Sequence, residues 1–133
     1  MRSTLILVAF LCPLTAALAQ NQSETFVSGS VALLDRELPQ MNRAVAEKDR
    51  TYFGPALERV KAFLSAWEKR DALFAIERYS ACREAVTDFL IVGLCKMPSP
   101  DPICKPTTFF PKAERYIEQC RVMAAQASGS THK

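Results

Sequence analysis

The chain has 133 residues, of which 49% are hydrophobic and 23% charged, and its net charge is +3. These values fit a single globular domain and argue against a disordered or collagen-like chain. Because the basic residues are interspersed with acidic ones, nucleic acid is not expected as a partner, and a single His with four Gly excludes most common catalytic and phosphate-binding arrangements.

Residues 1–19 have the organisation of a cleaved export signal. Arg2 precedes an apolar segment, and Ala17 and Ala19 provide small side chains at the two positions that a signal peptidase inspects. The alternative is a membrane anchor, but the apolar segment is much shorter than the roughly 20 residues that span a bilayer. We therefore predict cleavage before Gln20, a mature domain over 20–127 without a membrane span, a flexible tail over 128–133, and a periplasmic or secreted location.

The cysteine count agrees with export. Cys12 lies in the signal, and an even number remains, namely Cys82, Cys95, Cys104 and Cys120. Four cysteines in a small exported chain predict two disulfides. A zinc site or a redox-active pair is not expected, because the chain has no C-x-x-C motif and its single His lies in the tail at position 132.

Hydrophobic periodicity predicts an all-α, four-helix bundle-like domain, since no alternating run typical of a strand is found. The first helix should begin near Glu24, with Pro39 kinking or dividing it near Leu38. Its apolar residues recur three and four positions apart and form one seam, which consists of Val27, Val31, Leu34, Leu38, Met41 and Val45.

Residues 49–55 should connect the first helix to the second, because Gly54 favours an end and Pro55 a beginning. The second helix has an apolar seam that consists of Leu57, Val60, Leu64 and Trp67. A third helix is expected over 71–95. Its seam consists of Ile76, Tyr79, Cys82, Val86, either Phe89 or Leu90, and Leu94. The two seams differ in phase, which favours a break near 69–71; one long helix over 55–95 is the alternative. The apolar run 89–95 should be deeply buried or form a contact surface.

A proline-rich loop over 96–106 should join the third helix to a fourth, which Thr107 or Thr108 would cap, with Pro111 in its first turn. The inner face of the fourth helix would comprise Ala113, Ile117, Cys120 and Ala124. An antiparallel hairpin favours the nested pairs Cys82–Cys120 and Cys95–Cys104. Pairing Cys82 with Cys95 would bridge about 20 Å along one helix, which no disulfide reaches, and the crossed pairing needs the loop to fold back over the helix.

The residues of the chain indicate neither an enzyme nor a bound metal or other cofactor. No Ser or Thr has a recognisable activating partner, and no His follows an inward Glu at the spacing that a di-metal bundle needs. Two carboxylate pairs lie four residues apart on helices, Glu84 with Asp88 and Glu114 with Glu118. We assign both pairs to solvated helix faces.

Four aromatic residues lie at connector or loop positions rather than on a seam: Tyr52, Phe53, Phe109 and Phe110. They are the candidate contacts for a protein partner, although aromatic rings at such positions can also close the ends of a bundle. We therefore predict non-enzymatic protein recognition in the cell envelope, by an inhibitor, an immunity-type protein, an adaptor or an accessory subunit. The alternative is a carrier that holds a small apolar ligand between its helices.

Overall fold

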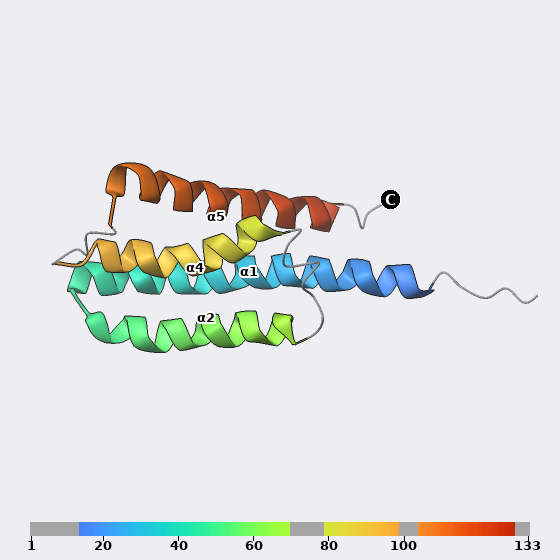
Figure 1. Cartoon of the computed structure of the whole chain (residues 1–133), viewed down its shortest axis with the longest axis horizontal. Helices are drawn as coiled ribbons and strands as arrows, with labels where there is room; N and C mark the ends of the chain where they lie inside the picture. Colours follow the sequence, from blue (N-terminus) through green and yellow to red (C-terminus); the bar gives the residue numbers. More distant parts are fainter. Residues whose placement is uncertain (1–13, 70–78, 99–103, 130–133) are drawn as a thin grey trace, which may run out of the picture.

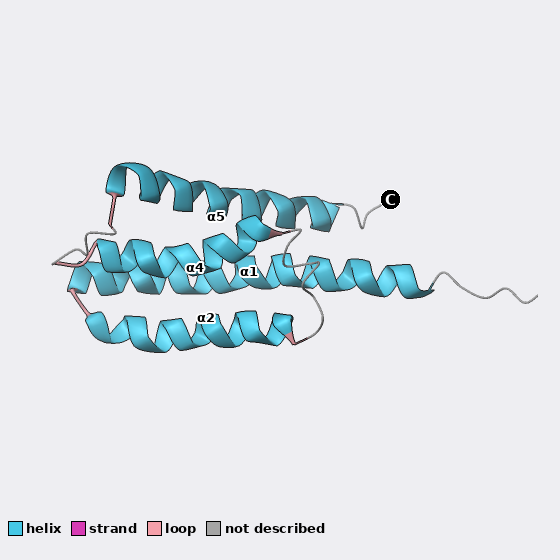
Figure 2. Cartoon of the chain, viewed as in Figure 1, coloured by secondary structure: helices cyan, strands magenta, loops and turns pink. Residues whose placement is uncertain are grey.

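The computed structural model describes residues 14–69, 79–98 and 104–129, with side chains from residue 26 onward. These residues form four helices, α1 (Leu14–Glu47), α2 (Phe53–Glu68), α4 (Ser80–Cys95) and α5 (Pro106–Gly129), and a short 3-10 turn, η1 (Arg50–Tyr52) (Figures 1 and 2). The described ranges contain no strand. The predicted all-α, bundle-like fold is confirmed.

The helices are arranged with α1 and α4 in the middle and with α2 and α5 on opposite sides of that pair (Figure 1). Both α2 and α5 pack against α1 and α4, but α2 and α5 do not contact each other in the described parts of the chain. Each outer helix therefore covers a different side of the central pair. None of the described helices is both long enough and apolar enough to cross a membrane.

Helix α1 carries the predicted seam. Val27, Leu34 and Met41 are buried, and the other seam residues are partly buried against the core. The helix begins at Leu14, before the expected start, and runs across the position where we predict cleavage. Pro39 lies inside this helix and does not divide it, which excludes one of the two predicted effects, a kink or a division. Proline removes one backbone donor, and the packing of the seam on both sides of Pro39 offsets that loss.

The second and third predicted helices are separate, because α2 ends at Glu68 and α4 begins at Ser80 and runs in the opposite direction (Figure 1). A single helix over 55–95 is thereby excluded. The predicted start near Asp71 and the seam residue Ile76 lie outside the described residues. Trp67 is 7% exposed and packs edge to face on Phe26, with ring centroids 5.4 Å apart, so it belongs to the core.

Two seam residues were predicted to be buried and are not. Leu57 on α2 is 44% exposed and Leu94 on α4 is 47% exposed. Burial within the run 89–95 is likewise uneven, because Leu94 is exposed whereas Phe89, Leu90 and Gly93 are buried. At Gly93 the helices approach so closely that a Cβ would lie 2.7 Å from the Met41 side chain.

Helix α5 begins at Pro106, ahead of the predicted Thr cap, so Pro111 falls in the second turn rather than the first. The helix extends to Gly129 and thus includes two residues of the predicted tail. Cys120 and Ala113 are buried on its inner face. The two disulfides have the predicted nested pairing, with Cα–Cα distances of 4.7 Å for Cys82–Cys120 and 5.3 Å for Cys95–Cys104.

Candidate functional site

Two phenylalanines on the first turns of α5 form, with Lys96, the most distinctive surface group of the molecule. We call Lys96, Phe109 and Phe110 the aromatic surface. The two rings meet edge to face with centroids 6.4 Å apart, and the Lys96 Nζ lies 5.5 Å from the Phe110 centroid. An ammonium at that distance from a ring is held by a cation–π interaction. The group therefore combines two apolar rings with one positive charge.

Both phenylalanines are partly exposed and neither belongs to the described hydrophobic core or to the residues packed against it. Sequence reasoning placed them in a loop, whereas the structure places them on α5. The helix can begin before them because Pro106, at its first position, needs no hydrogen-bond partner for its nitrogen. The Phe109 backbone N–H then donates to the Lys105 carbonyl at 2.8 Å, which fixes the first turn.

Covalent and polar contacts brace this end of the bundle. The Cys95–Cys104 disulfide joins the last residue of α4 to the segment that leads into α5. Arg50, in η1, donates from Nη2 to the Pro98 carbonyl at 2.7 Å and so ties the α1–α2 connection to the end of α4. The backbone beside Lys96 is consequently held from two directions.

The other two candidate aromatics lie in a different environment. Phe53 is 7% exposed and belongs to the hydrophobic core. Tyr52 is partly buried, and its hydroxyl donates to Glu37 Oε2 at 2.9 Å. Ring contacts pair Tyr52 with Phe53 and Phe109 with Phe110. Tyr52 and Phe53 therefore contribute to the interior of the protein, because the segment that connects α1 to α2 is helical and packs against the core.

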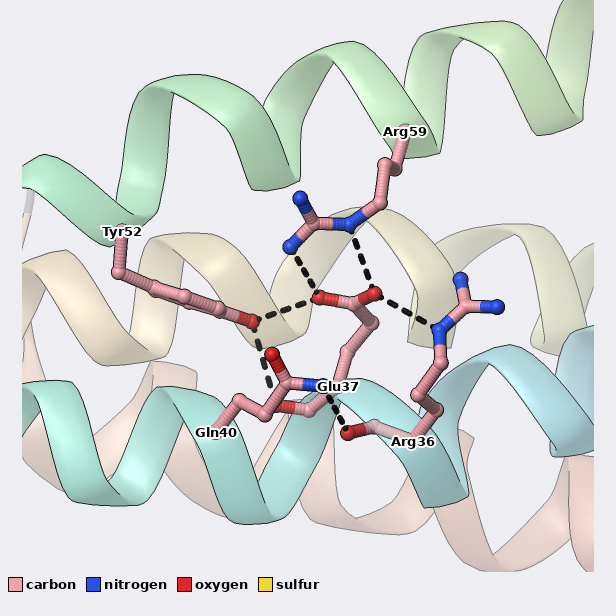
Figure 3. Close-up of polar contacts among 5 residues, drawn as sticks. All are labelled: Arg36, Glu37, Gln40, Tyr52 and Arg59. Atoms are coloured by element: carbon pink, nitrogen blue, oxygen red, sulfur yellow. Dashed lines mark hydrogen bonds and ion pairs between the residues drawn. The ribbon is translucent and has the colours of Figure 1, made fainter.

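Tyr52 belongs to a buried polar cluster around Glu37 (Figure 3). The Glu37 side chain is 1% exposed and accepts a bidentate pair of hydrogen bonds from Arg59, Nε to Oε1 at 2.9 Å and Nη2 to Oε2 at 2.8 Å. Arg36 Nε donates to Oε1 at 3.1 Å. With the Tyr52 hydroxyl, these donors occupy all the acceptor positions of the carboxylate and link α1, η1 and α2.

The electrostatics of this cluster favour the ionised carboxylate. The Arg59 hydrogen bonds, opposed by burial and aided by those from Tyr52 and Arg36, lower the pKa of Glu37 from 4.5 to about 2. Burial and the adjacent Glu37 raise the pKa of the Tyr52 hydroxyl. A carboxylate whose pKa is lowered to about 2 is a weak base near pH 7, so this arrangement is suited to holding helices together.

Sequence reasoning did not identify Glu37. A signal was nevertheless present, because Glu37 follows Leu34 by three residues and precedes Met41 by four, which places it on the buried seam of α1. A buried acid at such a position requires a cation within hydrogen-bond distance. The partner Arg59 lies on another helix, and spacing alone does not identify it.

The assignment of Asp88 to a solvated helix face is wrong. Asp88 is 6% exposed, and its Oδ2 has no hydrogen-bond partner. Burial, followed by the charge of Glu84, raises the pKa of Asp88, while Lys112 on α5 lowers it. Glu114 and Glu118 are exposed, as predicted. In the described ranges, no group of three or more His, Cys, Asp or Glu side chains is placed to hold a metal ion.

We expect Asp88→Asn to stabilise the protein at pH 7. The folded state binds the Asp88 proton more tightly than the unfolded state, so stability is greatest below the unfolded pKa and falls as pH rises through the folded pKa. The melting temperature of Asp88→Asn at pH 7 should be higher than that of the native protein, and the gain should vanish near pH 3. Glu114→Gln, on an exposed face, is the control. A lower melting temperature for Asp88→Asn at pH 7 would show that Lys112 dominates.

Comparisons of the chain with protein-family models, with curated proteins and with solved structures gave no significant match.

Proposed function

We propose that the protein is an exported, non-enzymatic recognition protein that binds another envelope or secreted protein through the aromatic surface of Lys96, Phe109 and Phe110. The observation that carries this proposal is the pair of partly exposed phenylalanine rings that lie outside the described core on a braced end of the bundle. Aromatic side chains are enriched among the residues that dominate binding energy at protein interfaces.

The bracing of this surface favours recognition because it lowers the cost of binding. A surface held by the Cys95–Cys104 disulfide and by the Arg50–Pro98 hydrogen bond loses little conformational entropy when a partner binds. The charge of Lys96 suits a partner that presents an acidic group beside an apolar one. The two disulfides are compatible with an oxidising compartment outside the cytoplasm, which supports the predicted export.

The carrier alternative is less well supported by the geometry. Sites for small ligands usually enclose most of the ligand surface. An apolar groove of about 410 Å³ lies between α2 and α4, but Leu57 and Leu94 in its lining are 44% and 47% exposed. Such an open groove encloses a small molecule poorly. We therefore propose recognition rather than carriage.

The proposal predicts that replacing both Phe109 and Phe110 with Ala abolishes partner binding and leaves the fold intact. The oxidised protein and its variants would be used as bait in an extracytoplasmic extract from the source organism, with recovered proteins quantified by mass spectrometry. One stoichiometric protein should be recovered with the native protein and with Val122→Ala, a control at an exposed α5 position, and should be lost with the double variant.

Two results would contradict this prediction. Recovery of the same protein by the double variant would show that the rings are not the contact. A large loss of helix content or melting temperature in that variant would assign the rings to the interior instead.

A further inference from the structure

The side of the molecule formed by α2 and α4 carries an apolar groove that no other described element covers. It is lined by Phe53, Leu57 and Val60 from α2 and by Leu90, Ile91 and Leu94 from α4. Helix α5 packs on the opposite side of α1 and α4 and does not contact α2 (Figure 1). We name this surface the α2–α4 groove.

The sequence pattern indicates that something covers this groove. Leu57 and Leu94 continue the apolar seams of their helices at spacings of three and four residues, which is the pattern of a buried contact. The other described seam residues are at least partly buried in the single chain, whereas these two are 44% and 47% exposed. Both lie in the lining of the same groove, so one covering partner would bury both.

We propose that a second copy of this chain covers the α2–α4 groove and that the protein forms a symmetric dimer through it. A two-fold interface requires one patch that is complementary to itself. This patch is a hollow of about 410 Å³ whose lining carries no charged residue and includes two leucines that are 44% and 47% exposed. The apolar lining of one copy can therefore be covered by the same apolar residues of the other.

The charges around the groove favour a copy of the same chain over a partner of opposite charge. On α2, Lys61 Nζ pairs with Glu58 at 2.9 Å, and on α4, Arg83 pairs with Glu84 at 3.5 Å. The charges of α2 therefore sum to zero, whereas α4 carries one negative charge in excess, that of the buried Asp88. Two such faces can meet without opposing blocks of like charge, and neither attracts a strongly charged protein.

The area of the face predicts the strength of the dimer. Each helix has 16 residues and is about 24 Å long, and two helices side by side are about 20 Å wide. Pairing covers about 500 Å² on each chain, or about 1,000 Å² in total, which is near the lower limit for a specific interface. We therefore expect a reversible dimer rather than a permanent one.

Dimerisation would leave Phe109 and Phe110 accessible, because they lie on α5, and α5 and α2 lie on opposite sides of the central pair (Figure 1). A dimer would then present two aromatic surfaces and could bind a divalent partner with increased avidity. This consequence rests on the proposed function, whereas the dimer itself does not.

Sedimentation velocity of the oxidised protein between about 1 and 500 µM tests the inference. The native protein should shift from monomer to dimer with concentration, and Leu57→Glu and Leu94→Glu should remain monomeric with unchanged helix content. The matched control is Val122→Glu, which introduces the same charge at a 45% exposed position on α5 and should dimerise like the native protein.

A second variant keeps the test decisive if a Glu variant misfolds. Thr87 is exposed in the lining of the groove, so Thr87→Leu should enlarge the apolar face of both copies and tighten the dimer at least about tenfold. A native protein that stays monomeric throughout the range would overturn the dimer. Dimerisation of the Leu57→Glu and Leu94→Glu variants at the native concentration would also overturn it, as would a Thr87→Leu dimer no tighter than the native one. A bound apolar molecule that native mass spectrometry detects in the native protein, and that Leu57→Glu releases, would assign the groove to a small ligand instead of a second copy.

Discussion

Replacing Glu37 with Gln should lower the free energy of unfolding at pH 7 by about 2 kcal/mol, because the buried side chain loses the negative charge that its hydrogen-bond donors stabilise, while water partly balances the charge of the 39% exposed Arg59. The cluster joins α1, η1 and α2, and α2 makes its other described contacts mainly with α4. Loss of the ion pair should therefore weaken the attachment of α2 most. Urea denaturation followed by circular dichroism measures the change.

The pH dependence of this effect has a defined sign. The pKa of Glu37 is lowered from 4.5 to about 2 in the folded protein, so its contribution is complete above pH 4.5 and is lost as pH falls toward 2. The stability difference between native protein and Glu37→Gln should stay constant from pH 7 to about 5 and then shrink toward pH 2.

The matched control is Glu58→Gln, which removes an exposed ion pair with Lys61 and should change stability little. If Glu37→Gln and Glu58→Gln were equally harmless at pH 7, the cluster would not hold α2 in place.

Replacing both Cys82 and Cys120 with Ser should lower the free energy of unfolding by about 4 kcal/mol, against about 2.5 kcal/mol for Cys95 and Cys104. The first bridge closes a longer segment, with a sequence separation of 38 compared with 9, and so restricts the unfolded chain more. Cys82 and Cys120 are also fully buried, so their replacement places two hydroxyls in the core.

The two disulfide variants should differ in function as well as in stability. Loss of Cys95–Cys104 should weaken partner binding, because that bridge braces the backbone beside the aromatic surface. Loss of Cys82–Cys120 should affect binding only as far as it unfolds the domain. Thermal unfolding of both variants, together with the pull-down, separates the two effects, and equal losses of stability would contradict the assignment.

The sequence predicted the fold because local patterns determine most of it. The apolar seam of α1 and the hairpin geometry of Cys82, Cys95, Cys104 and Cys120 depend on spacing along the chain, and both were confirmed. The break between α2 and α4 was favoured by a change in seam phase. Of the two effects predicted for Pro39, a kink or a division of the helix, the division does not occur, because the effect of a proline depends on the packing around it.

The residues that were misplaced depend on contacts between helices. Glu37 is satisfied by Arg59, which lies 22 residues away, and no spacing rule identifies such a pair. Phe53 was a candidate partner contact because its connector was treated as a loop, with closure of the bundle end as the alternative; it begins α2 and belongs to the core. Leu57 and Leu94 were predicted to be buried because a seam does not indicate whether the chain itself or a second molecule covers it.

Photo-crosslinking inside the source organism tests the central claim, protein recognition through the aromatic surface, most directly. A photoreactive phenylalanine analogue placed at Phe109 preserves the ring, and the same analogue at Val122 provides an exposed control on the same helix. Illumination should give one adduct from position 109, with a protein other than this chain, and none from position 122. The absence of any protein adduct at 109, or the same adducts at both positions, would contradict recognition through this surface.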